Sequence, residues 1–233
     1  MYVIDAPVVP SVAVDGSADR FPVHRIYCIG RNYADHAKEM GATIDRGNPV
    51  FFLKVADSIW NHAAPVPYPP ATSDLHHEVE LVVALRGGGA NLRASQVAAL
   101  IYGYAVGLDL TRRDLQAAAK AKGLPWDTGK SFDAAAPIGA LKAMPGALLE
   151  QGELRLEVNG ELRQASDIGE MIFPVTEIVA RLSALYTLTA GDLIFTGTPA
   201  GVGALQPGDR FNARCADLPP LDGAMGPPRP THA

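Results

Sequence analysis

Two glutamates two residues apart, Glu78 and Glu80, are the side chains whose type and spacing most directly indicate chemistry. They lie in residues 74–85, which read as a β-strand, and they point to the same face because side chains alternate along a strand. Burying two neighbouring carboxylates without compensation is costly. A hard divalent cation such as Mg²⁺ or Mn²⁺ would resolve that conflict, whereas a solvated strand face would need no ion. The opposite face is apolar and comprises Val79, Leu81, Val83 and Leu85.

Asp109 is the third acidic candidate, and it lies at the end of a predicted strand over residues 102–110. An aspartate between two leucines is either a helix cap or a ligand. The segment 111–114 already reads as a capping box with Thr111 in the cap position, so Asp109 remains free to bind a cation. Lys130 lies in a loop just beyond the helix that follows.

His36 and Glu39 form a second candidate constellation. We expect a short helix over residues 32–41 with Asn32 as its cap, and side chains three residues apart on a helix can touch. Such a pair is either a surface contact or a general base in which the glutamate orients and charges the imidazole. Lys54 ends an apolar strand, where its ammonium either reaches solvent or faces an anionic ligand.

Composition argues against several classes of protein. The 233 residues carry a net charge of −5 with no basic patch, which argues against a nucleic-acid partner. No apolar run approaches the roughly 18 residues of a membrane-spanning helix, and residues 1–10 lack the positive charge of a signal peptide. With only two cysteines, Cys28 and Cys215, no disulfide framework is expected, and a cytoplasmic location is the default.

The sequence indicates one domain between two terminal segments. Residues 1–24 read as an N-terminal arm or short edge strand, and residues 25–217 as the main domain. Within that domain, residues 153–162 alternate around Asn-Gly and predict a two-residue hairpin, and residues 176–187 predict an amphipathic helix. Residues 218–233 contain five prolines, so we expect a disordered tail whose removal after Leu218 leaves folding and activity intact.

Six segments along the chain resemble, in order, those of the fumarylacetoacetate hydrolase family. The likeness rests on all six together, covers about residues 22–210, and is greatest to the branch that cleaves fumarylpyruvate. The segments are Gly30-Arg31-Asn32-Tyr33-Ala34-Asp35-His36, Phe52-Leu53-Lys54, His77-Glu78-Val79-Glu80-Leu81, Gly107-Leu108-Asp109-Leu110-Thr111-Arg112-Arg113-Asp114-Leu115-Gln116, Lys130-Ser131-Phe132-Asp133 and Phe195-Thr196-Gly197-Thr198-Pro199-Ala200-Gly201-Val202-Gly203.

The resemblance implies an α+β fold, namely a fumarylacetoacetate hydrolase-like mixed β-roll or sandwich with short peripheral helices. It implies that residues 25–217 are a catalytic domain and that the chain forms a homodimer. Mg²⁺ or Mn²⁺ would be bound by Glu78, Glu80 and Asp109. After Asp209 the family's terminal strand pattern is degraded, so a strand at that edge is expected to be short.

The resemblance also implies roles for individual side chains. His36 with Glu39 would activate water, and Lys130 would supply positive charge near the cleaved bond. The residues expected to line the substrate site are Arg31, Tyr33, Lys54, Arg113, Gln116 and Thr198.

The implied reaction is metal-dependent hydrolysis of a carbon–carbon bond in a small diketo acid. The substrate expected first is the acylpyruvate fumarylpyruvate, with fumarate and pyruvate as products. An alternative within the family is oxaloacetate decarboxylation, or isomerisation or decarboxylation of a dienoic diacid. A non-catalytic metal- or acid-binding protein is a third interpretation, which the intact set of His36, Glu39 and Lys130 disfavours.

Overall fold

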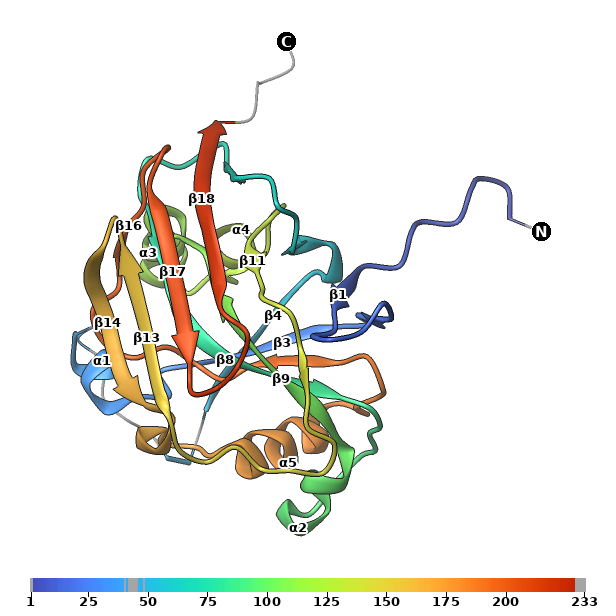
Figure 1. Cartoon of the computed structure of the whole chain (residues 1–233). Helices are drawn as coiled ribbons and strands as arrows, with labels where there is room; N and C mark the ends of the chain where they lie inside the picture. Colours follow the sequence, from blue (N-terminus) through green and yellow to red (C-terminus); the bar gives the residue numbers. More distant parts are fainter. Residues whose placement is uncertain (1, 40, 42–45, 48, 229–233) are drawn as a thin grey trace.

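Two β-sheets that pack face to face enclose the main core of the molecule (Figure 1). The computed structural model describes residues 2–39, 41, 46–47 and 49–228. The six-stranded sheet has the order β12 (Lys142–Ala143), β9 (Ile101–Leu108), β8 (Val79–Leu85), β15 (Leu193–Phe195), β3 (Ile26–Gly30) and β4 (Val50–Lys54). The five-stranded sheet has the order β14 (Glu161–Asp167), β13 (Glu153–Val158), β17 (Arg210–Cys215), β18 (Leu221–Pro228) and β6 (Val66–Tyr68).

Short strands and helices surround these two sheets, and the mixed sheets with short helices agree with the predicted fold class. The smaller sheets are β10 (Thr111–Arg112) with β7 (Leu75–His77) and β16 (Gly203–Ala204), β1 (Ser11–Ala13) with β2 (Arg20–Pro22), and β11 (Ala136–Pro137) with β5 (Ile59–Trp60). The α-helices are α1 (Ala34–Glu39), α2 (Ala94–Val97), α3 (Arg113–Ala121), α4 (Asp127–Lys130) and α5 (Val175–Leu185), and the 3₁₀-helices are η1 (Ala56–Ser58), η2 (Ala98–Leu100) and η3 (Ile168–Glu170). None of the helices in the described chain is long and apolar enough to cross a membrane.

Strand β8 is buried on both of its faces, whereas the sequence pattern predicted one apolar face and one acidic face. Its odd-numbered side chains, Val79 to Leu85, belong to the core between the two large sheets. Val82 and Ala84 point the other way and belong to a second apolar cluster with Val12 and Phe21 of the β1–β2 ribbon. The N-terminal segment therefore covers the outer face of the six-stranded sheet.

Strand β15 lies at the centre of the six-stranded sheet although it is only three residues long. It pairs in parallel with β3, where Leu193 faces Ile26, and antiparallel with β8, where Leu193 faces Ala84. The pairs β8–β9 and β3–β4 are therefore joined in this sheet through β15 alone. The predicted Asn-Gly hairpin is confirmed by β13 and β14, and the predicted amphipathic helix by α5.

The prediction of a disordered tail is wrong for residues 221–228, which form strand β18. This strand is antiparallel to β17 and parallel to β6, and it buries Leu221 and Met225. Prolines are tolerated because Pro227 and Pro228 occupy the last two positions of the strand. The strand after Asp209 is not shortened either, because β17 runs for six residues between β13 and β18. Residues 229–233 of the predicted tail lie outside the described residues.

We now expect truncation after Leu218 to destabilise the protein, contrary to the expectation from composition. Burial of a Leu or Met side chain contributes ~1.5–3 kcal/mol, so the loss of Leu221 and Met225 should lower the free energy of unfolding by roughly 3–6 kcal/mol. Denaturant titration followed by circular dichroism would measure this. Truncation after Pro228 keeps β18 and is the control that isolates the contribution of this strand. Equal stability of the parent and the variant truncated after Leu218 would contradict the prediction.

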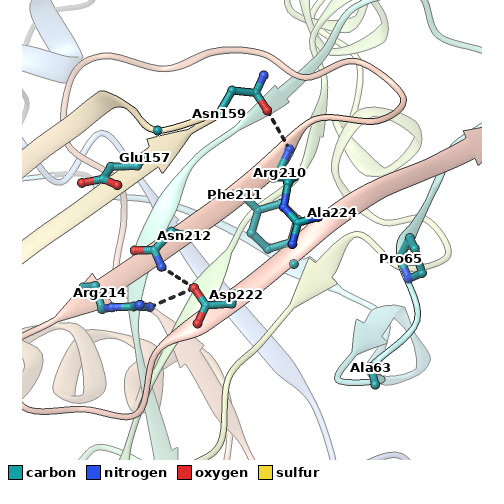
Figure 2. A pocket seen from close by; sticks show the side chains of 12 residues that line it. Ala63, Pro65, Glu157, Asn159, Arg210, Phe211, Asn212, Arg214, Asp222 and Ala224 are labelled. Atoms are coloured by element: carbon teal, nitrogen blue, oxygen red, sulfur yellow. Dashed lines mark hydrogen bonds and ion pairs between the residues drawn. The ribbon is translucent and has the colours of Figure 1, made fainter.

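A broad hollow lies over β17, β18 and the Asn159 turn (Figure 2). Its charges balance: Arg214 pairs with Asp222 at 3.1 Å, while Arg210 and Glu157 also line it. Asp222 also accepts a hydrogen bond from Asn212, and the hollow contains no cluster of metal-ligating residues among those described. We therefore place the chemistry in a narrower cavity at the N-terminal end of β8.

Candidate active site

The pairing of β8 with β9 brings the three predicted carboxylates together. Glu80 faces Gly107 across the ladder, and just beyond it the backbone N–H of Asp109 donates to the carbonyl of Glu78 at 2.8 Å. Oxygen atoms of Glu78, Glu80 and Asp109 lie within 4.8 Å of one another, and all three residues are buried. Gly107 permits this arrangement, because a Cβ there would lie 2.7 Å from the Phe195 ring.

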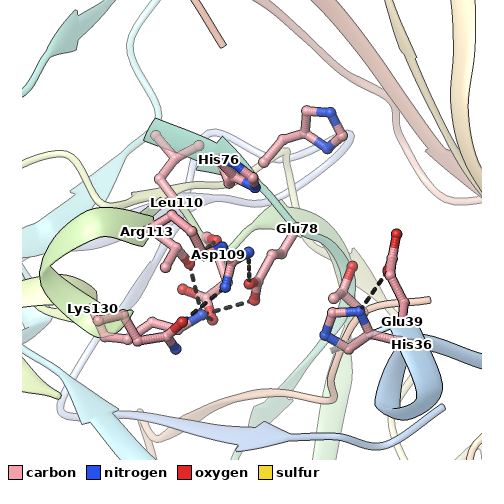
Figure 3. A network of polar contacts seen from close by, with 12 residues as sticks. His36, Glu39, His76, Glu78, Asp109, Leu110, Arg113 and Lys130 are labelled. Carbon is pink, nitrogen blue, oxygen red and sulfur yellow. Dashed lines mark hydrogen bonds and ion pairs between the residues drawn. The ribbon is translucent and has the colours of Figure 1, made fainter. Parts of the chain in front are cut away.

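Two of these carboxylates are held by cations. Lys130, at the end of α4, donates to Glu78 Oε2 and to Asp109 Oδ2, each at 2.7 Å, and Arg113 donates to Glu78 Oε1 at 2.6 Å (Figure 3). Burial alone would raise the pKa of Glu78, but Lys130 and Arg113 hold it well below its usual range. Burial would likewise lower the pKa of Lys130, yet Asp109 and Glu78 raise it to about 12. Lys130 therefore remains charged at neutral pH.

Glu80 has a different environment. Its Oε2 accepts the backbone N–H of Gly197 at 2.7 Å, and it forms no ion pair with a lysine or arginine among the described residues. Burial, with Asp109 and Glu78 nearby, raises the pKa of Glu80 well above its ordinary value. An added positive charge would relieve this cost. On the chemistry of their donor atoms, the three carboxylates fit a hard divalent cation.

Thr111 and Lys54 support this cluster in ways the sequence did not predict. Thr111 is not a helix cap; its hydroxyl donates to the Asp109 carbonyl and accepts the third hydrogen bond from Lys130, at 2.7 Å. Lys54 was predicted to line the substrate site, but it is buried behind Asp109, to which its ammonium is paired at 2.8 Å. It also donates to the carbonyl groups of Leu110 and Lys130. Lys54 therefore positions Asp109 rather than facing the cavity.

The predicted His36–Glu39 pair forms on α1. His36 Nδ1 lies 3.2 Å from Glu39 Oε2, and His36 is buried in the cavity wall whereas Glu39 is partly exposed (Figure 3). An ionised carboxylate only accepts hydrogen bonds, so Nδ1 donates to it and Nε2 is left as the proton acceptor. The backbone N–H of Gly201 donates to Glu39 Oε1 at 3.2 Å and anchors that carboxylate. Helix α1 begins at Ala34, and the Asn32 side chain donates to the carbonyls of Phe173 and Thr196 instead of capping the helix.

One narrow cavity collects most of the predicted site residues. Tyr33 is an exception: it lies in the core, its hydroxyl has no hydrogen-bond partner among the described residues, and burial raises its pKa. Glu39 lies behind His36 and Lys54 behind Asp109, so neither lines the wall. The predicted residues that do line the cavity are Arg31, His36, Glu78, Glu80, Asp109, Arg113, Gln116, Lys130 and Thr198.

Sequence reasoning missed several residues that hold or line this cavity. Gln164 donates to Thr198 Oγ1 at 2.8 Å and accepts the backbone N–H of Val79 at 3.1 Å, so it ties the first residue of β8 to the 196–203 loop. No local pattern marks it, because it is the one buried residue of β14. Lys120 and Trp126 also line the cavity. Lys120 could have been found, since it follows Gln116 by one helical turn.

The comparison with known families decides the affiliation of the chain. The family model described as "Fumarylacetoacetate (FAA) hydrolase C-terminal" matches residues 25–225. The chain belongs to this family. The match includes every residue that lines the cavity, and it extends through most of β18, which agrees with the corrected boundary of the fold.

Individual relatives match most of the chain. A fumarylpyruvate hydrolase of Ralstonia is 43% identical over 81% of this chain and 99% of its own length. The mitochondrial oxaloacetate tautomerase of Rattus norvegicus is 44% identical over 81% of this chain and 85% of its own length. The crystal structure of a fumarylpyruvate hydrolase from Pseudomonas aeruginosa, in complex with Mn²⁺ and pyruvate, matches with a TM-score of 0.94 and 41% identity, covering 97% of this chain and 99% of that one.

Proposed function

We propose that this protein is a metal-dependent hydrolase that cleaves the carbon–carbon bond of an acylpyruvate, with fumarylpyruvate as its substrate and fumarate and pyruvate as products. The observation that carries the proposal is the presence, in one cavity, of a carboxylate-oriented imidazole and three clustered carboxylates. The relatives named fumarylpyruvate hydrolase support the choice of substrate.

The metal proposed for the site is Mn²⁺ or Mg²⁺. Glu78, Glu80 and Asp109 would hold it, and when bound it supplies a Lewis acid for the keto oxygens of the substrate. The Mn²⁺ complex of the Pseudomonas aeruginosa relative supports this assignment.

In the proposed reaction the protein's own residues activate water and stabilise charge. His36 removes a proton from water through Nε2, and Glu39 stabilises the imidazolium that results. The resulting hydroxide attacks the acyl carbonyl, the bond to the pyruvate methylene breaks, and the electron pair passes to the pyruvate as an enolate. The charged Lys130 lies in the cavity wall, where its positive charge favours the developing enolate. Return of the proton held by the His36 imidazolium to the enolate carbon completes pyruvate and restores the base.

Substrate-binding roles are proposed for the remaining residues of the cavity wall. Arg113 and Gln116 project from the first turns of α3, and the Arg113 guanidinium donates to Gln116 Oε1 at 2.8 Å, so the two side chains hold each other in position. Thr198 is fixed from behind by Gln164. With Arg31, these groups offer donors suited to the carboxylate and keto oxygens of a keto acid.

Oxaloacetate chemistry is the second candidate, because a relative 44% identical to this chain is named an oxaloacetate tautomerase. We expect the purified protein, supplied with Mn²⁺, to show a higher kcat/KM for fumarylpyruvate cleavage than for oxaloacetate decarboxylation or tautomerisation. Loss of absorbance of the diketo acid and coupled detection of pyruvate would measure this. Turnover of oxaloacetate without cleavage of fumarylpyruvate would reverse the order of the two candidates.

We also propose that the protein acts in the cytoplasm as a homodimer. The family resemblance supports the dimer, and the two cysteines are free and buried, as suits a reducing compartment. Sedimentation equilibrium would test the assembly, and a monomeric mass at micromolar concentration would contradict it.

A further inference from the structure

Lys120 lies in the wall of the carboxylate cavity and has no part in the chemistry proposed above. It occupies the last turn of α3, where it shares a helix face with Arg113 and Gln116 at spacings of three and four residues. Its ammonium stands 4.8 Å from the centre of the Trp126 ring, which lines the same cavity. A partly buried cation over an aromatic ring thus faces the space that the substrate must enter.

The cationic side chains in and around the cavity wall differ in whether they are paired with a carboxylate. Arg113 and Lys130 are paired with Glu78, and Lys130 and Lys54 with Asp109. By contrast, neither Lys120 nor Arg31 forms an ion pair with any carboxylate in the described part of the chain. Considering only the described residues, the cavity therefore presents two cations without a carboxylate partner, which could meet an anion.

The electrostatic environment of Lys120 agrees with this. Burial, together with the nearby charges of Arg113 and Arg31, lowers the pKa of Lys120 to about 8. The ammonium is still the main form of the side chain at neutral pH. This environment disfavours the charged form, and a bound anion would relieve that free-energy cost. The Trp126 ring gives the ammonium an aromatic contact at 4.8 Å but no negatively charged partner.

We propose that Lys120, with Arg31 beside it, binds a second carboxylate at the acyl end of the substrate, so that the cavity selects acylpyruvates that are diacids. This proposal rests on the proposed function. It adds that the cavity recognises the second carboxylate, which distinguishes diacid substrates from other acylpyruvates. Trp126 and Phe52, whose ring centres are 6.1 Å apart, offer flat apolar surfaces for a planar unsaturated chain between the two carboxylates.

The test compares two substrates that differ in this carboxylate, fumarylpyruvate and acetylpyruvate. Lys120→Met keeps an unbranched side chain of similar length and removes the charge. Since a hydrogen bond to a charged group is involved, it should raise KM for fumarylpyruvate roughly tenfold or more and leave KM for acetylpyruvate unchanged. Lys120→Arg should retain most of the preference. Lys122→Met, at an exposed position two residues further along, is the matched control.

An equal change of KM for both substrates, or no change for either, would overturn the assignment of Lys120. Failure of the proposed function has a different signature, since the parent protein would then cleave neither substrate. In that event calorimetric titration with fumarate and with crotonate, which has a methyl group in place of one carboxylate, decides the question. The subsite requires that Lys120→Met weaken fumarate binding alone; equal fumarate affinity in parent and variant would refute it.

Discussion

Dialysis against EDTA should abolish cleavage of fumarylpyruvate, and added Mn²⁺ or Mg²⁺ should restore it. The physical reason is the cluster of Glu78, Glu80 and Asp109, whose oxygens lie within 4.8 Å of one another in a buried site. Burial and the two neighbouring carboxylates raise the pKa of Glu80, so the cluster is better suited to hold a cation than to remain without one. The rate is to be measured together with the metal content of the same sample.

The fold has to survive dialysis for this result to be interpretable, and an unchanged circular dichroism spectrum is the control. Glu80→Ala is expected to lower metal content and to impair fumarylpyruvate cleavage and oxaloacetate decarboxylation alike, because both reactions need the metal site. Full activity in a preparation without measurable metal would exclude the central element of the proposed mechanism.

His36→Ala should reduce kcat/KM for fumarylpyruvate by roughly 10²–10⁴-fold, the range typical of a lost general base. Hydrolysis needs a base for the attacking water, whereas decarboxylation of oxaloacetate involves no attacking water. Any oxaloacetate decarboxylation should therefore fall much less in the same variant. Steady-state kinetics on the two substrates, at matched metal content, would separate the two reactions.

Glu39→Gln should also reduce fumarylpyruvate cleavage more than oxaloacetate decarboxylation, but by smaller factors than His36→Ala. The imidazole remains in this variant, and only its charged partner at 3.2 Å is lost. His62→Ala is the matched control, since His62 is exposed and lies outside the cavity wall. If His36→Ala cleaves fumarylpyruvate at the parental rate, His36 and Glu39 are a structural pair and the water must be activated elsewhere.

The acidic centre could be predicted because its geometry follows from local rules. The alternation of a strand places Glu78 and Glu80 on one face, and antiparallel pairing with the next long strand then brings Asp109 beside them. The i, i+3 spacing likewise predicts the contact between His36 and Glu39. In each case the partners lie on one strand, one helix, or two strands that follow each other in the chain.

The predictions that failed concern residues whose actual partners are distant in the sequence. Asn32 and Thr111 match the local signature of helix caps, but Asn32 bonds to Phe173 and Thr196, which are 141 and 164 residues away. Thr111 instead accepts a hydrogen bond from Lys130. A capping pattern is only one of the uses of a short polar side chain, and the sequence alone does not show which partner competes for it.

The prediction of a disordered C-terminal segment, made from its composition, failed for the same reason. A high proline content predicts disorder when no partner strand is known, yet β18 forms because β17 and β6 lie on either side of it. Tyr33 and Lys54 were correctly recognised as members of family segments and were still misplaced. Residues two or three positions away line the cavity, but the side chains of Tyr33 and Lys54 lie in the core and behind Asp109.

The central place of β15 has a consequence for synthesis on the ribosome. Helix α1, with the pair proposed to activate water, follows β3, whereas the carboxylates lie on and beside β8 and β9. The two halves meet in the sheet only through residues 193–195. The β3–β4 and β8–β9 pairs of this sheet therefore each keep an open edge until more than four-fifths of the chain has been made. Activity should arise late and all at once, and a chaperone that shields sheet edges would act during that interval.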